Sequence, residues 1–273
     1  MKFSVLLSVY IKEKPSYLEL ALKSIWDDQT LKPNEIVVIK DGPLNEELDN
    51  IIALFTKRAP VKLIVLEKNV GLSEALNIGL KECAYPLVAR MDTDDISLPQ
   101  RFETQIQYFE TSPNLDVLGS KANKIDKEGT EIGELNVPVS NAEIKKYIWT
   151  CPFIHPTVMF KKESIIKAGG YKKEAGPRQD DYDLWFRCGS LNFNFENIDN
   201  KLLLYRFFEV NVVKNNVRVG WYRFKTGLRG CISNHCSFIA YIGILIPFLR
   251  SLLPYPLNIW FYKFANKFNP RDK

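Results

Sequence analysis

The residues best suited to chemistry are three aspartates in the run Asp92-Thr93-Asp94-Asp95, directly after the apolar stretch 85–91. Carboxylates this close repel one another unless a cation or hydrogen-bond donors compensate their charge. Mg²⁺ and Mn²⁺ prefer oxygen ligands and are often held by one or two carboxylates together with substrate phosphates. We therefore interpret this run as a candidate metal site for a phosphate-bearing substrate. The alternative is an acidic turn ahead of a helix that begins near Pro99.

A second acidic cluster, Asp180-Asp181-Tyr182-Asp183, opens a helical pattern at residues 180–190. A carboxylate opposite a leaving group can act as a general base on a hydroxyl. Acids in the first turn of a helix also complement its dipole, which is the structural alternative. The two clusters together suggest a division of labour, with a metal at the first and proton transfer at the second.

The elements that must position these residues alternate between short apolar runs and helical patterns. The predicted elements are strands at 3–9, 35–40, 61–67 and 85–91 and helices at 15–28, 45–58 and 72–82, the last capped by Ser73 or Asn69. This order predicts an α/β fold with a mainly parallel, Rossmann-like sheet. Ligands of such sheets bind beyond the carboxyl ends of the strands. Residues that follow strand ends are therefore predicted to converge on one edge: Ser8, Tyr10, Asp41 and the Asp92 to Asp95 run.

The second half of the chain is less regular. Strands are predicted at 115–119 and 157–160, and His155 lies in a proline-bracketed loop before the second of them. His155 is a candidate contact for a second substrate, and a structural loop histidine is the alternative.

The C-terminal segment has a different character. Residues 201–273 hold twelve Lys and Arg against two acids, a formal charge of +10, whereas residues 1–200 carry −5. Apolar residues 238–249 would form a helix of about 18 Å, too short for a bilayer core of about 30 Å. Aromatic residues interleaved with cations suit a membrane interface. We predict attachment of this segment to a membrane surface, the alternatives being a helix packed on the main domain or a re-entrant span.

Composition excludes several classes of protein. The chain is 46% hydrophobic and 25% charged, as expected of a globular domain rather than a disordered or multi-span chain. Two His residues leave no His-rich zinc site, and GxGxxG, GxxxxGK[ST] and GxSxG motifs are missing. Five Cys without a CxxC pair favour a reducing compartment. The apolar run 3–10 is interpreted as a buried strand rather than a signal peptide.

The sequence motifs, taken in their order along the chain, resemble those of glycosyltransferase family 2. Members of this family are inverting enzymes that use nucleotide sugars and adopt the GT-A fold. The resemblance covers about residues 2–207 of the chain. It is carried by Ser8-Val9-Tyr10, Asp41-Gly42, Asn69-Val70-Gly71-Leu72, Ala75-Leu76-Asn77-Ile78-Gly79, Val88 through Asp95, His155-Pro156, Gly169-Gly170-Tyr171 and Asp180 through Trp185.

The resemblance implies a role for each matching residue. Ser8, Tyr10, Asp41 and Asp92 would contact the donor nucleotide or its sugar, and Arg90 would supply a contact that the family often makes from the position of Leu76. Asp94 and Asp95 would hold Mn²⁺ or Mg²⁺. Asp181 would be the base, although the family has Glu-Asp where this chain has Asp180-Asp181, which leaves Asp180 as the alternative. His155 and Trp185 would face the acceptor.

These implications define a complete hypothesis. Residues 1–207 would form the GT-A domain, with a donor half at about 1–112 and an acceptor half at 113–207, and residues 208–273 a helical membrane-association segment. The enzyme would move one sugar from a nucleotide diphosphate sugar, with UDP favoured, to a glycan or lipid-linked acceptor at the cytoplasmic membrane face. Bacterial surface polysaccharide assembly is the implied setting, and no nucleic-acid partner is expected. A nucleotidyltransferase or a non-catalytic protein that binds anionic surfaces are the alternatives.

Overall fold

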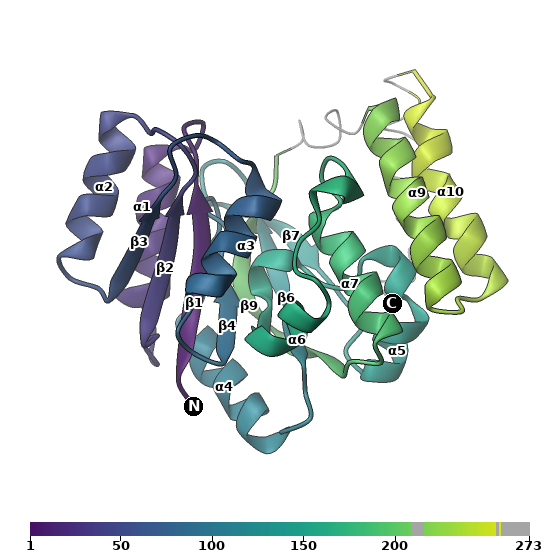
Figure 1. Cartoon of the computed structure of the whole chain (residues 1–273), viewed down its shortest axis with the longest axis horizontal. Helices are drawn as coiled ribbons and strands as arrows, with labels where there is room; N and C mark the ends of the chain where they lie inside the picture. The colour runs from purple at the N-terminus through teal and green to yellow at the C-terminus, as the bar shows by residue number, and fades with distance from the viewer. Residues whose placement is uncertain (209–215, 255–256, 258–273) are drawn as a thin grey trace.

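The computed structural model describes residues 1–208, 216–254 and 257, and one mixed sheet forms the centre of this part of the chain (Figure 1). Its nine described strands have the order β3-β2-β1-β4-β8-β6-β9-β5, with β7 paired to β6. Neighbours are parallel from β3 to β4 and between β6 and β9. Helices cover both faces, so the predicted α/β class is confirmed.

The N-terminal half is a β-α-β-α-β-α-β unit. Its elements are β1 (Phe3–Val9), α1 (Pro15–Trp26), β2 (Glu35–Lys40), α2 (Glu46–Thr56), β3 (Val61–Val65), α3 (Leu72–Glu82) and β4 (Leu87–Arg90). The predicted bounds of β1, β2 and α3 are confirmed, and the other elements are slightly shorter than predicted. The predicted cap of α3 is wrong: Gly71 occupies the N-cap with φ of 89°, and no side chain caps the helix. Glycine tolerates this positive φ, which lets the chain turn sharply into α3.

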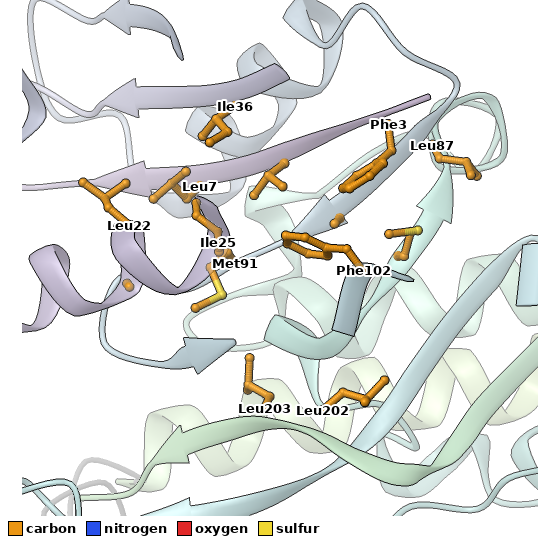
Figure 2. Close-up of a cluster of buried hydrophobic side chains, with 14 of the residues drawn as sticks. Phe3, Leu7, Leu22, Ile25, Ile36, Leu87, Met91, Phe102, Leu202 and Leu203 are labelled. Carbon is orange, nitrogen blue, oxygen red and sulfur yellow. The ribbon is translucent and has the colours of Figure 1, made fainter. Parts of the chain in front are cut away.

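The core has two layers because successive side chains of a strand point to opposite faces. Val5 and Leu7 of β1 face the first layer, whereas Leu6 faces the second. Helices α1, α2 and α4 (Arg101–Thr111) contribute to the first layer, and α3, α6 (Lys162–Lys167) and α7 (Asp180–Ser190) to the second. Figure 2 shows part of the first layer, where the Phe3 and Phe102 ring centroids are 5.1 Å apart.

The second half extends the same sheet with mixed pairing. Its strands are β5 (Ile96–Ser97), β6 (Val117–Ile125), β7 (Glu131–Leu135), β8 (Met159–Lys161) and β9 (Phe195–Arg206). The strands predicted at 115–119 and 157–160 correspond to β6 and β8, each of which begins two residues later. The short β5 follows the acidic run and pairs antiparallel with β9. This pairing brings the end of β9 next to the end of β4.

Helix α7 has its predicted bounds, and three acids occupy its first turn. The remaining short helical segments are α5 (Asn141–Lys146), η1 (Ile148–Thr150), η2 (His155–Thr157) and η3 (Lys173–Ala175). All four precede α7 in the chain, and η1 and η3 contact it.

The C-terminal segment forms a hairpin of two helices, α9 (Val217–Ser233) and α10 (Phe238–Ser251), which lie side by side at the end of the molecule away from α2 (Figure 1). The hairpin packs on α7, and Cys231, Ala240 and Ile244 belong to the second core layer. The predicted helix at 238–249 is thus present and shares a core with the main domain. Residues 209–215, next to the predicted domain boundary, and 258–273, with most of the terminal aromatic residues, lie outside the described residues.

Among the described residues, no helix combines the length and the apolar character needed to cross a bilayer.

Helix α9 approaches α7 through a glycine, which generates a stability prediction. A Cβ at Gly230 would lie 2.1 Å from a ring atom of Phe186. Gly230→Ala gains about 1 kcal/mol of helix propensity, but overpacking costs about 1–3 kcal/mol. We expect a net loss of about 1 kcal/mol in the free energy of unfolding, measured by urea denaturation. The exposed neighbour substitution Arg229→Ala is the control and should leave stability nearly unchanged. A Gly230→Ala protein as stable as this control would contradict the packing described.

Candidate active site

The acidic run lies at the carboxyl end of β4, where two arginines hold it. Arg90, the last residue of β4, is buried, and its guanidinium donates to Asp92. Asp95 is also buried, and its Oδ1 accepts the backbone N–H of Arg206 at 2.7 Å. The Arg206 Nε donates to the backbone oxygen of Asp94 at 2.9 Å. The loop is therefore fixed between the ends of β4 and β9.

The site carries more negative charge than these arginines offset. Burial and the nearby Asp92 raise the pKa of Asp94 to about 6, and burial raises that of Asp95 well above its usual value. Burial raises the pKa of Glu13 to about 7, with the charges of Asp94 and Asp92 adding to the effect and a hydrogen bond with Thr93 opposing it. Each raised pKa reports that the ionised form is disfavoured, so a bound cation would be favourable here.

The sequence analysis missed Glu13. It lies in the loop after β1. The sequence feature that could have identified Glu13 is an acidic residue in a loop that directly follows a predicted strand. Its charge and that of Asp94 also raise the pKa of Tyr10, after the larger effect of burial. Tyr10, Glu13 and Asp94 therefore lie near one another at the same edge of the sheet.

The carboxylates at this site could supply only part of the ligands that a metal ion requires. Within the described ranges, no group of three or more His, Cys, Asp or Glu side chains could hold an ion alone. Asp94 is the more accessible carboxylate, while Asp95 is buried with its Oδ2 lacking a hydrogen-bond partner among the described residues. Such a site suits an ion that takes its remaining ligands from substrate phosphates and water.

Arg90 also has unused hydrogen-bonding capacity. Its Nε and Nη1 are buried and have no hydrogen-bond partner in the described part of the chain. Buried donors without partners are unfavourable, and an oxyanion is the partner that a guanidinium fits best.

Asp41 follows β2 and organises the loop before α3. Its carboxylate accepts the backbone N–H groups of Val70, at 2.7 Å, and Gly71, at 3.1 Å. Ser8 is half-buried near the end of β1, where Val9 pairs with Lys40 of β2. Parallel pairing thus places Ser8 and Asp41 at one edge of the sheet, as predicted from the strand order. Their contact with a nucleotide stays a prediction.

The second acidic cluster lies at the start of α7. Asp180 accepts a hydrogen bond from the Ser73 hydroxyl in the first turn of α3, and burial raises its pKa. Asp181 accepts the Tyr182 backbone N–H at 2.8 Å through Oδ1, and the Cys151 thiol lies 3.5 Å from its Oδ2. The two neighbouring aspartates therefore have different partners.

The two acidic clusters act on the same two partly buried side chains. Burial raises the pKa of Tyr205, on β9, and the charges of all three aspartates of the first cluster and of Asp181 raise it further. Asp92 and Asp181 both raise the pKa of His155, against larger lowering effects of burial and of Arg90. The acids that follow β4 and the acid that opens α7 therefore act electrostatically on the same two side chains, Tyr205 and His155.

The two residues predicted to face an acceptor lie beside each other, with ring centroids 6.2 Å apart. His155 is partly exposed, and its Nε2 lies 3.0 Å from the Tyr171 hydroxyl. Trp185 is fully buried, with its ring centroid 4.9 Å from that of Phe153. Trp185 therefore belongs to the second core layer in this structure, and acceptor contact by either residue stays a prediction.

Comparison with known proteins agrees with this geometry. The family model "Glycosyl transferase family 2" matches residues 4–170, so the chain belongs to glycosyl transferase family 2 and is a glycosyltransferase. The chain is 41% identical to the amylovoran biosynthesis glycosyltransferase AmsE of Erwinia amylovora, over 80% of each protein. It is 33% identical to the UDP-Gal:alpha-D-GlcNAc-diphosphoundecaprenol beta-1,3-galactosyltransferase of Escherichia coli, over 96% of this chain and 95% of that enzyme.

A solved structure shares the fold. The mannosyltransferase PcManGT of Pyrobaculum calidifontis, in complex with GDP-Man and Mn²⁺, superposes with a TM-score of 0.62. The match covers 97% of this chain and 80% of that protein at 13% identity. The predicted GT-A fold is confirmed. Membership of the family also decides against the nucleotidyltransferase and the non-catalytic binding protein.

The environment of His155 predicts a pH dependence of stability. Burial and Arg90 lower its pKa from 6.5 to about 4. Between these pH values the unfolded chain binds the proton and the folded chain does not, so stability falls as pH decreases through this window. Allowing for its partial exposure, we expect His155 to contribute about 2 kcal/mol to this fall. His155→Gln, which is neutral throughout, should therefore show a shallower loss of unfolding free energy between pH 7 and pH 4. Equal slopes for the two proteins would contradict an uncharged His155.

Proposed function

We propose that this glycosyltransferase moves one sugar from a nucleotide diphosphate sugar to a lipid-linked glycan, with inversion at the anomeric carbon. The observation that carries the proposal is the presence of two acidic sites, one at the end of β4 and one at the start of α7, whose charges both act on His155 and Tyr205. A single displacement needs a leaving group and a base on opposite sides of the sugar, and two such sites can supply both.

The end of β4 is the proposed donor site. Ser8, Tyr10 and Asp41 would contact the base and ribose, while Arg90 and Asp92 would bind nearer the phosphates and the sugar. The unpartnered N–H groups of Arg90 support this assignment because phosphate oxygens could accept them.

Asp94 and Asp95 are the proposed metal-holding residues, for Mn²⁺ or Mg²⁺. The raised pKa of Asp94 supports this role, since a cation would stabilise its ionised form. When bound, the ion would offset the charge of the diphosphate leaving group. The burial of Asp95 supports a role behind Asp94, orienting the loop through its bond to the backbone of Arg206.

Asp181 is the proposed base, which would accept the proton of the acceptor hydroxyl. The contacts of the two neighbouring acids support this choice. Asp180 is bonded to the Ser73 hydroxyl and links α7 to α3, whereas Asp181 accepts the Tyr182 backbone N–H and the weaker S–H donor of Cys151.

The proposed donor is a UDP-sugar and the proposed acceptor a lipid-linked saccharide in bacterial surface polysaccharide assembly. The galactosyltransferase relative, whose name gives both a UDP donor and a diphosphoundecaprenol acceptor, supports this part of the proposal. The QxxRW signature of processive synthases is missing from the sequence, which favours a single addition.

The α9–α10 hairpin is the proposed attachment to the cytoplasmic face of the membrane. Its exposed apolar side chains include Phe238, Ile239 and Ile242, which are 79%, 70% and 50% exposed. Arg218 and Arg229 are exposed on the adjacent helix α9. An amphipathic, cationic surface of this kind suits an anionic lipid interface.

The base assignment predicts the effect of one substitution. Asp181→Asn keeps the shape of the side chain but removes its basicity, so sugar transfer should fall by at least about 100-fold. Nucleotide-sugar binding, followed by calorimetry in the presence of Mn²⁺, should change little because Asp181 lies on the acceptor side. Asp180→Asn serves as the matched comparison. If Asp180→Asn abolishes transfer and Asp181→Asn does not, the base assignment passes to Asp180.

The membrane assignment predicts the result of a vesicle experiment. Phe238→Asp combined with Ile242→Asp should abolish co-flotation of the protein with anionic phospholipid vesicles, because buried apolar contacts would be replaced by charges repelled by the lipid. Leu54→Asp, at a 62% exposed position on α2, is the matched control and should float like the wild type. Flotation of the double variant at the wild-type level would show that α10 is not the attachment surface.

A further inference from the structure

Cys151 occupies an unusual backbone position beside the proposed base. It follows η1, is buried, and has φ of 63°, in the left-handed region that few residues other than glycine adopt. Such a conformation is unfavourable by about 1–3 kcal/mol and persists only where the surroundings impose it. A residue kept in this conformation near an active site calls for a functional explanation.

The surroundings of Cys151 fix it on both sides. Its backbone N–H donates to Ile148 at 3.2 Å, and the oxygen of the next residue, Pro152, accepts Nδ2 of the buried Asn197 at 3.0 Å. Phe153 then packs between Trp185 and Phe195, with ring centroids at 4.9 and 5.6 Å. The position of the thiol is therefore determined by the core and not by a flexible loop.

The thiol contacts the carboxylate of Asp181. Sγ of Cys151 donates to Oδ2 at 3.5 Å, while Oδ1 accepts the backbone N–H of Tyr182 at 2.8 Å. One oxygen is thus held by the helix itself and the other by the thiol, which together define the plane of the carboxylate. A thiol is a weak donor, so it can orient Oδ2 with little competition for the proton of an acceptor hydroxyl.

Asp180 gives a contrast within the same helical turn. Its carboxylate accepts the O–H of Ser73, a stronger donor than a thiol, and it joins two helices. The stronger donor, Ser73, is bonded to Asp180, which connects two helices. The weaker donor, Cys151, is bonded to Asp181, which is proposed to take up a proton.

We propose that Cys151 is a positioning residue, which orients the Asp181 carboxylate toward the acceptor hydroxyl by donating its S–H to Oδ2. This inference rests on the proposed role of Asp181 as the base. It assigns a function to the left-handed backbone at Cys151, since the thiol reaches the carboxylate from that conformation.

Four substitutions in the full-length enzyme separate the donor from the backbone conformation. Cys151→Ala removes the donor, and Cys151→Gly removes the donor but relieves the left-handed backbone. Cys151→Ser keeps a hydroxyl donor, and Cys151→Asn supplies an N–H donor in a residue that tolerates this conformation. We expect the Ala and Gly variants to lose about 10-fold in kcat with the donor KM within twofold of wild type, whereas Ser and Asn retain at least half of kcat.

Cys188→Ala is the matched control because Cys188 is a second buried cysteine, fully enclosed on α7. It should lower the melting temperature but leave kcat near the wild-type value. A wild-type kcat for Cys151→Ala, or recovery of kcat in Cys151→Gly, would overturn the proposal, the second result by showing that only the backbone matters. Losses in all four variants that follow their melting temperatures would overturn it as well.

The outcome for Asp181→Asn separates the two proposals. If Asp181→Asn is inactive and Cys151→Ala has a wild-type kcat, only the positioning role fails. If Asp181→Asn retains turnover, the base assignment fails first, and the positioning role fails with it.

Discussion

The structure depends on holding several carboxylates together at the carboxyl end of β4. Glu13, Asp94 and Asp95 all have raised pKa values there, since burial removes the water that would otherwise stabilise their charges. Arg90 and Arg206 offset part of this charge from opposite sides. The remaining imbalance is what makes the site suited to a cation bound together with a phosphate-bearing substrate.

Elements from the second half of the chain help to hold these carboxylates together. The short β5 pairs with β9, and this pairing delivers Arg206 to the aspartate loop. Loop geometry at the neighbouring strand ends is equally restricted: a Cβ at Gly42 would lie 2.6 Å from the backbone nitrogen of Asn69. This edge of the sheet is therefore built from backbone contacts that tolerate few substitutions, while α7 is supported by the C-terminal hairpin.

The parts of the fold that sequence predicted well are those fixed by local pattern. β1 and β2 are mainly apolar runs buried on both faces, and α7 begins with three acids that complement its dipole. The family resemblance then identified the acidic clusters because their order along the chain is specific. Strand β9 escaped prediction because its middle holds polar residues such as Asp199, and its pairing with β6 is a long-range effect.

The site residues that sequence missed share a physical cause. Glu13, Arg206 and Cys151 interact with the acidic residues through partners far along the chain, so no local motif marks them. The complete burial of Trp185 and the missing side-chain cap of α3 are likewise consequences of tertiary packing. Local sequence located the acids, whereas the groups that set their charge and orientation required the assembled structure.

The central claim is that the acids after β4 hold the diphosphate while Asp181 faces the sugar from the other side. A crystal structure of the full chain with UDP and Mn²⁺, with the ion located by its anomalous scattering, tests this most directly. The account predicts Mn²⁺ bound to Asp94 and to the diphosphate, with the terminal phosphate directed toward Asp181. An ion bound away from Asp94, or a terminal phosphate directed away from α7, would contradict it.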